Sequence, residues 1–346
     1  MRRIRTRWTG WLGLLALGLG AEAHAQDISL DLDAAKAKKL GIDLAPLEQQ
    51  LEDQAGDALN LADPQTFIDS MANANGIATK GMGVDYASNM KAFVIGAGFG
   101  SAVHASGFRF NRTDDYLPPG GFSFMVSAMA GINLGVLDGG AKTFLDRVRV
   151  YGNGMSLDLP SDREFGGTMY NIGVHVQLKL LRPMGNAVAK WGGFDLTTGW
   201  ERSQYQLEMT HAVPIEVPLE QKVTATWTAD GVYQIRSLTD SIPVELSTNV
   251  RLAVITVFAG GGVDINTATS SSEASLSGPV DAHFQGNEEN LGSASLTVGY
   301  DGVGDPVVPR GFGGLQVNLS LFKIYGQLNA GANGAVGGHL GARVAM

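Results

Sequence analysis

Two stretches of sequence decide the fold class: Phe122–Val136, FSFMVSAMAGINLGV, and Tyr170–Leu180, YNIGVHVQLKL. Every even-numbered position in the first stretch is apolar, and its odd-numbered positions include Ser, Gly and Asn. In the second stretch the even positions are again apolar, and Asn171, His175 and Lys179 stand between them. Successive side chains of a strand point to opposite faces, so both stretches predict strands with one apolar face and one polar face.

The same alternation recurs from Phe93 to the end of the chain, and several runs are longer than the usual strand of a soluble domain. A strand needs about 9 to 11 residues to cross a bilayer, and the runs at Phe122, Tyr170 and Ile242–Phe258 are at least that long. No helix-length segment separates the runs, which favours antiparallel neighbours. We therefore predict an all-β fold, an antiparallel transmembrane β-barrel of about 12–14 strands with an even number preferred.

The first 25 residues have the features of a secretory signal peptide. They combine a basic start, the apolar run Trp11–Leu19 and the small residues Ala23-His24-Ala25 before Gln26. We expect cleavage after Ala25 and a location in the cell outer membrane of a Gram-negative bacterium.

Residues 26–80 differ from the rest of the chain and predict a short helical N-terminal segment. Leu40, Leu44, Leu47 and Leu51 have helical spacing, and Asp63-Pro64 is suited to an N-cap and first helical residue. We expect this segment to be a plug or a periplasmic cap, and residues 81–346 to form the outer-membrane β-barrel.

Composition excludes several kinds of chemistry. The 346 residues contain no Cys, which removes thiol nucleophiles and Cys-ligated metals, and the net charge of −9 argues against a nucleic-acid partner. The His residues stand singly, without metal-ligand spacing. Val94–Ser101 is similar to a dinucleotide-binding turn, but no helix pattern follows it. We expect no enzyme activity, no cofactor and no metal.

The polar faces of the predicted strands would line the barrel lumen, where charges pair with one another or select solutes. The lumen-facing candidates are Arg147, Arg149, His175, Lys179, Glu201, Arg251 and Lys323. The polar stretches His104–Gly121 and Asn266–Gly292 predict surface loops.

The chain resembles Gram-negative outer-membrane β-barrel proteins and, less closely, their long-chain fatty-acid transporter group. The resemblance lies in Ala23-His24-Ala25, in the helical stretch before the first strand, and in the closing pair Gly314–Tyr325 and Gly338–Met346. It implies outer-membrane lipid and the barrel-assembly machinery as partners. Such barrels usually end in an aromatic residue, whereas this chain ends in Met346.

Three functions remain open from the sequence. The first is a channel for passive transfer of small or hydrophobic solutes. The second is a structural or adhesive surface barrel that acts through its extracellular loops. The third is a soluble periplasmic β-sandwich that serves as a binding module.

Overall fold

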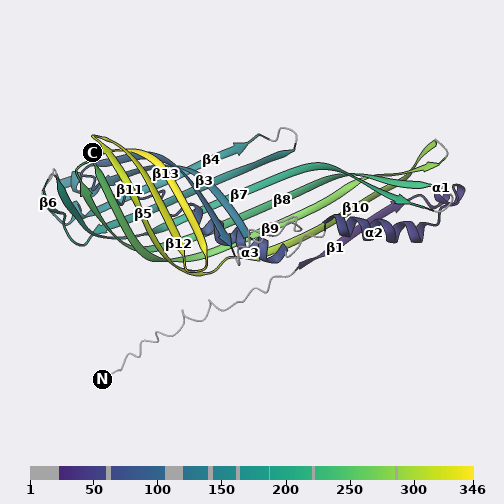
Figure 1. Cartoon of the computed structure of the whole chain (residues 1–346), viewed down its shortest axis with the longest axis horizontal. Helices are drawn as coiled ribbons and strands as arrows, with labels where there is room; N and C mark the ends of the chain where they lie inside the picture. The colour runs from purple at the N-terminus through teal and green to yellow at the C-terminus, as the bar shows by residue number, and fades with distance from the viewer. Residues whose placement is uncertain are drawn as a thin grey trace, which may run out of the picture.

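The structure is a computed structural model that describes residues 23–59, 64–105, 120–138, 143–160, 164–186, 188–219, 223–284 and 287–346. Its strands join one antiparallel sheet of 13 strands. Ten of the described strands pair in a closed ring, since β13 pairs with β2 and β8 pairs with β9. The predicted all-β antiparallel fold is confirmed (Figure 1). The 13 strands of the sheet agree with the predicted 12–14, but only ten of them close the ring, an even number.

The ring strands, in chain order, are β2 (Phe93–Ala105), β3 (Gly120–Asn133), β4 (Val148–Leu159), β5 (Phe165–Lys179), β7 (Ala189–Pro218), β8 (Thr224–Leu252), β9 (Ile255–Phe284), β11 (Val307–Leu319), β12 (Phe322–Gly331) and β13 (Ala335–Ala345). One end of the barrel carries the start of β2, the end of β13 and the short connections Leu252–Ile255 and Leu319–Phe322. We call it the turn end. It also holds the small strand β6 (Met184–Gly185) and the 3₁₀ turns η1 (Leu134–Asp138) and η2 (Leu145–Arg147).

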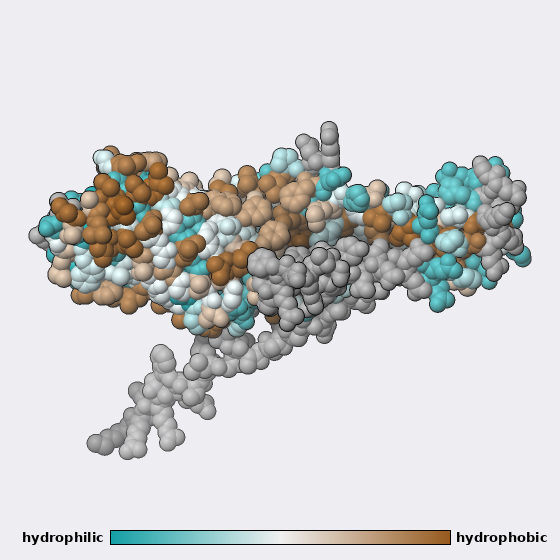
Figure 2. Space-filling view, in the orientation of Figure 1, coloured by the Kyte–Doolittle hydropathy of each residue, from teal (hydrophilic) through white to brown (hydrophobic). Residues whose placement is uncertain are grey.

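The predicted alternation separates the outside of the barrel from its inside. On β5, Tyr170, Ile172 and Val174 are exposed, whereas Asn171 and His175 are buried. Exposed apolar side chains recur on the outer faces of the ring strands, among them Ile95, Val244, Leu315, Ile324 and Leu340. Figure 2 shows hydrophobic residues gathered over the barrel.

Two predicted strand boundaries were wrong. The run Phe122–Val136 leaves the sheet after Asn133, whose side-chain oxygen accepts the N–H of Gly135 and begins η1. The run Ile242–Phe258 is two strands, because Ala253 adopts a φ of 51° in the tight turn between β8 and β9. After that turn the outward positions are odd-numbered, so Phe258 is buried in the barrel.

Beyond the ring, β7, β8 and β9 continue into a flat extension, which β10 (Asn287–Val303) and β1 (Ala23–Leu32) complete in the order β1-β10-β9-β8-β7 (Figure 1). Residues 266–292, predicted as a surface loop, therefore lie mainly in β9 and β10. Their Ser and Thr side chains alternate with buried Leu276, Val280 and Ala282. The stretch is polar at every second position because one face of the sheet is covered by other parts of the chain and the opposite face is exposed.

The helices α1 (Ala34–Lys39) and α2 (Leu44–Leu59) cover that apolar face of the extension. Leu47 and Leu51 pack with Trp227 and Val280 in one buried cluster. Asp33 caps α1 through bonds from the N–H groups of Ala35 and Lys36, and the bond from Lys36 lowers the pKa of the Asp33 carboxyl. The start of the segment differs from the expectation, since residues 23–32 form a strand.

A third helix, α3 (Pro64–Ala78), begins at the predicted Pro64 and lies inside the barrel, where it contacts strands on several sides of the wall. The chain then continues through the lumen as residues 79–92, with Lys80, Val84 and Tyr86 buried. We call residues 64–92 the luminal segment. The expected signal region before Ala23, Asp63 and most of the predicted loop His104–Gly121 lie outside the described residues; Ala23–Ala25 belong to β1.

Candidate functional site: the filled barrel lumen

The lumen is filled by the luminal segment, which bonds to the wall along its length. Near the extension, Asn75 bonds to the Thr239 hydroxyl, with 3.1 Å between Nδ2 and Oγ1. Toward the turn end, Tyr86 donates its hydroxyl hydrogen to Glu245 over 2.6 Å. These contacts hold the segment against the polar inner face that the alternation creates.

A cluster of five buried charged side chains lies at the middle of the lumen; we call it the central ion cluster. It consists of Lys80 from the luminal segment and Glu201, Glu245, Asp264 and Arg310 from the wall. The Lys80 Nζ lies 2.9 Å from a Glu201 oxygen, 3.8 Å from an Asp264 oxygen and 2.5 Å from the Ser241 hydroxyl.

Arg310 connects the wall carboxylates to one another. Its Nε lies 2.8 Å from Asp264 Oδ2, its Nη2 bonds to Glu245, and its Nη1 donates to Asn329 over 2.7 Å. Buried charges are costly unless they are paired and hydrogen-bonded. Because Lys80 is the member contributed by the luminal segment, withdrawal of that segment would leave Glu201 without its closest cation.

Further ion pairs lie closer to the turn end. Arg343 binds Asp85 of the luminal segment over 3.1 Å, and its guanidinium lies 3.7 Å from the ring centre of Tyr325. Lys179 lies 2.9 Å from Asp195 and donates to Asn89 over 3.0 Å. The segment is thus anchored by charge at two levels of the barrel.

Glycines in the wall allow close approach of α3. A Cβ at Gly121 would lie 2.2 Å from the backbone nitrogen of Met71, and one at Gly100 would lie 2.5 Å from the carbonyl oxygen of Ala78. Neither contact could be relieved by a side-chain movement, since both atoms belong to the backbone. At these two positions the sequence therefore requires glycine for the helix to fit.

The structure separates the seven candidates from the sequence into two groups. Arg149, His175, Lys179, Glu201 and Lys323 are buried. Arg147 is partly buried in η2, and Arg251 is exposed near the β8–β9 turn, where its Nε donates to the carbonyl of Ala253. Arg147 and Arg251 do not join the luminal ion pairs described above, and neither does Lys323, whose Nζ donates to the carbonyl oxygen of Ser320 in the turn between β11 and β12.

Sequence reasoning missed Lys80, Asp85, Asp264 and Arg310. Asp264 and Arg310 lie on the inward parity of β9 and β11, together with Thr256 and Gln316, so extension of the alternation would have found them. Lys80 and Asp85 follow α3 without any period. Their wall partners, Glu201 and Arg343, lie more than a hundred residues away in sequence, and no local pattern indicates them.

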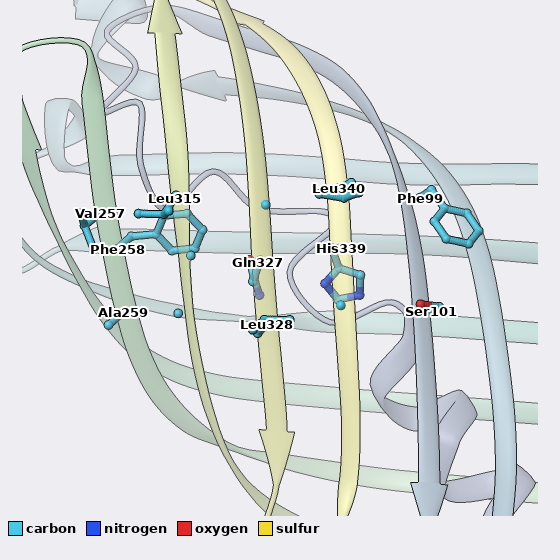
Figure 3. Close-up of a pocket in the computed structure, with 14 residues that line it drawn as sticks. Phe99, Ser101, Val257, Phe258, Ala259, Leu315, Gln327, Leu328, His339 and Leu340 are labelled. Carbon is cyan, nitrogen blue, oxygen red and sulfur yellow. The ribbon is translucent and has the colours of Figure 1, made fainter.

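The outer wall has a hollow of about 850 Å³ over β9, β11, β12, β13 and β2. Figure 3 shows Phe99, Val257, Leu315, Leu328 and Leu340 around it, and all five side chains are exposed. Gly313, Gly326 and Gly338 also line it. None of the lining residues is Asp, Glu, Lys or Arg, so the hollow belongs to the apolar outer face.

The described residues lack two features that would indicate other functions. They contain no group of three or more His, Asp or Glu side chains placed to hold a metal ion. No helix among them is long and apolar enough to cross a membrane.

Strand pairing and burial define a closed antiparallel β-barrel with a polar lumen filled by its own chain. Residues 35–346 match the model of the family described as Lsa36-like, and the chain belongs to that family. Curated proteins give no match.

The solved structures that the chain matches include outer-membrane β-barrels. The attachment invasion locus protein Ail of Yersinia pestis is 11% identical, with 74% of this chain and 100% of that chain covered and a TM-score of 0.22. The translocator domain of the autotransporter NalP from Neisseria meningitidis is 9% identical, with 74% and 89% covered and a TM-score of 0.28. A deletion mutant of the monoaromatic hydrocarbon channel TodX is 8% identical, with 80% and 97% covered and a TM-score of 0.23. These comparisons do not support the likeness to the long-chain fatty-acid transporter group.

Proposed function

We propose that the protein is an outer-membrane β-barrel that is closed by its own luminal segment and presents the extension as a binding surface. Of the functions that the sequence left open, this is the structural or adhesive surface barrel. The observation that carries the proposal is the pairing of an apolar outer face with a lumen filled through buried ion pairs.

Membrane insertion is supported by the outer face. The paired run of β2 with β3 reaches from Phe93 to Ala105, which is longer than the roughly 9 to 11 residues that a strand needs to cross a bilayer. Exposed apolar side chains surround the ring, and a soluble protein rarely exposes a continuous apolar surface of that size. In a membrane these apolar side chains would contact lipid instead of water, which accounts for their exposure on the outer face.

A binding role is supported by the extension. Its covered face packs under α1 and α2, and its other face exposes polar residues such as Glu216, Thr228 and Ser277. Figure 2 shows hydrophilic residues at the far end of the extension, in contrast to the barrel. This surface includes much of the stretch that the sequence predicted to be a functional loop.

A passive channel, the other membrane function expected from the sequence, would require the luminal segment to leave its place. That movement would break the buried pairs between Lys80 and Glu201 and between Arg343 and Asp85, which hold the segment in the lumen. The closed arrangement therefore argues for surface binding over permeation.

Liposome swelling tests the closure. We expect purified protein that migrates faster unheated than boiled, as a stable barrel does, and that leaves liposomes impermeable to small sugars. Swelling at the rate of a general porin, by protein with the same mobility shift, would overturn the closed barrel in favour of the channel. A soluble protein without a shift would overturn the membrane location.

A further inference from the structure

The luminal segment passes through the barrel from end to end, as its contacts along β8 demonstrate. Asn75 bonds to Thr239 over 3.1 Å, Lys80 to Ser241 over 2.5 Å, and Tyr86 to Glu245 over 2.6 Å. The amide of Asn89 then bonds to that of Asn249 over 2.9 Å. Both residue numbers rise together, and β8 runs from the extension toward the turn end.

The wall strand β13 gives the same direction independently. His339 contacts the carbonyl oxygen of Ala78 over 2.9 Å, and Arg343 contacts Asp85 over 3.1 Å. At the turn end, the N–H groups of Lys91 and Ala92 donate to the carbonyl oxygen of Met346 over 2.7 and 2.9 Å.

The entrance to the lumen lies beside the extension. Asp69 accepts the N–H of Val303 over 2.9 Å, and Asn73 accepts the N–H of Asp305 over 2.8 Å. Both wall residues lie near the end of β10 and the start of β11. The chain therefore enters where the extension joins the barrel and leaves at the turn end.

The length of this passage matches a membrane. From Thr239 to Asn249 the wall strand advances about 33 Å at roughly 3.3 Å per residue. A strand tilt of about 40° reduces that to roughly 25 Å along the barrel axis, about the height of the apolar band of outer-membrane barrels.

We infer that the N-terminal segment crosses the outer membrane through the lumen, so that residues 23–59 lie on the cell surface while the C-terminus faces the periplasm. The inference rests on the membrane location in the proposed function. Short turns of bacterial barrels face the periplasm and longer hairpins face outward. The turn end carries the two-residue turns Ala253-Val254 and Ser320-Leu321 together with the longer connections 134–147 and 180–188, whereas the long strands β7 to β10 project beyond the ring at the other end. The part of the protein on the cell surface is consequently the extension, which is built from both the N-terminal segment and the long hairpins of β7 to β10.

The absence of Cys from the chain allows a direct labelling experiment. Gln49→Cys places one thiol on the exposed side of α2, and Arg182→Cys places one beside β6 at the turn end. The probe is a maleimide joined to a polyethylene glycol too large to enter the periplasm. Lys38→Cys and Met184→Cys, also at exposed positions, repeat the pair if either first variant does not assemble.

The expected result is labelling of Gln49→Cys in intact cells and labelling of Arg182→Cys only after the outer membrane is permeabilised. Labelling of the turn-end thiol in intact cells, or protection of the α2 thiol until permeabilisation, overturns the inference. Each sample is also run unheated and boiled. Loss of the heat-dependent mobility shift in the wild-type protein would instead refute the membrane barrel itself, so the two failures are distinguishable.

Discussion

The Nζ of Lys80, from the luminal segment, lies 2.9 Å from Oε2 of Glu201, from the barrel wall, and both side chains are buried. One ion pair thus joins two parts of the chain that local interactions do not hold together. The two opposite charges stabilise each other only while the luminal segment occupies the lumen. Stability and closure of the barrel are therefore coupled at this contact.

Replacement of Lys80 by Met should destabilise the protein by about 3–5 kcal/mol, because it leaves Glu201 buried without its closest cation. The measurement is the temperature at which the unheated gel form is lost. Lys80→Met with Glu201→Gln should recover much of the loss, since no unpaired carboxylate remains. The control is Arg202→Met at the more exposed pair with Asp240, which should behave like the wild type. Equal effects at both pairs would contradict this role for Lys80.

Val174→Arg should impair membrane insertion, because the side chain is 50% exposed on the outer face of β5. A charge facing lipid near the midplane costs about 2–4 kcal/mol. The matched control is Thr228→Arg, on the exposed polar face of the extension. Comparison of the outer-membrane fractions checks the prediction, and equal yields of the two variants would count against a lipid-facing wall.

Gly121→Val should displace α3, because even a Cβ there would lie 2.2 Å from backbone atoms of the helix. Overpacking of this kind costs about 1–3 kcal/mol. We expect faster proteolysis of the luminal segment and measurable liposome swelling. Gly311→Ala is the control, since nothing lies within 4 Å of the added atom. A Gly121 variant that remains as closed and protease-resistant as the control would contradict the close approach of α3.

Trp227→Ala should release α1 and α2 from the extension while the barrel persists. Trp227 is 2% exposed in the cluster that contains Leu47 and Leu51, and truncation of a buried Trp costs about 3–5 kcal/mol. Limited proteolysis should cut near α2, whereas the heat-dependent mobility shift should remain. Thr228→Ala, at the exposed neighbour, should leave both readouts unchanged. Loss of the mobility shift in the Trp227 variant would mean that the extension and the barrel fold as one unit.

The barrel could be predicted because alternation is a local signal. From Tyr170 on β5 and from Phe122 on β3 each outward residue is apolar regardless of what lies inside, so the period of two is sufficient. The positions at which strands end were harder to predict. Ala253 turns the chain without a Gly or Pro, so the hairpin between β8 and β9 appeared to be one long strand.

The sequence predicted a loop where the extension has strands, because the polar residues on the solvent-exposed face of the extension resemble those of a loop. Ser270, Ser271 and Ser272 suggested a loop, yet Leu276 and Val280 show that every second position of β9 is buried. The central ion cluster could not be predicted as a unit. Lys80 lies in a segment without period, and its partner Glu201 is brought beside it only by the closure of the ring.

The occupied lumen also restricts substitutions on the inner face of the wall. A polar inner face facing open water would tolerate Arg at Gln177, but Gln177 is fully buried and accepts bonds from Arg149 and Tyr151. An Arg there would lose the acceptor oxygen and would add a second guanidinium beside Arg149. We therefore expect Gln177→Arg to be damaging, in contrast to what an open, water-filled barrel would permit.

The most direct test of the filled lumen is a disulfide between the luminal segment and the wall. A Cβ at Gly76 would lie 3.9 Å from the Thr239 methyl carbon, so Gly76→Cys and Thr239→Cys place two thiols next to each other, and a disulfide forms where the two Cβ atoms approach within about 4.5 Å. In protein extracted from the outer membrane, we predict oxidation of most molecules, seen as a reducible change of mobility after boiling. The pair Gly76→Cys and Thr228→Cys should remain reduced. Absence of the bond in correctly assembled protein would contradict the account.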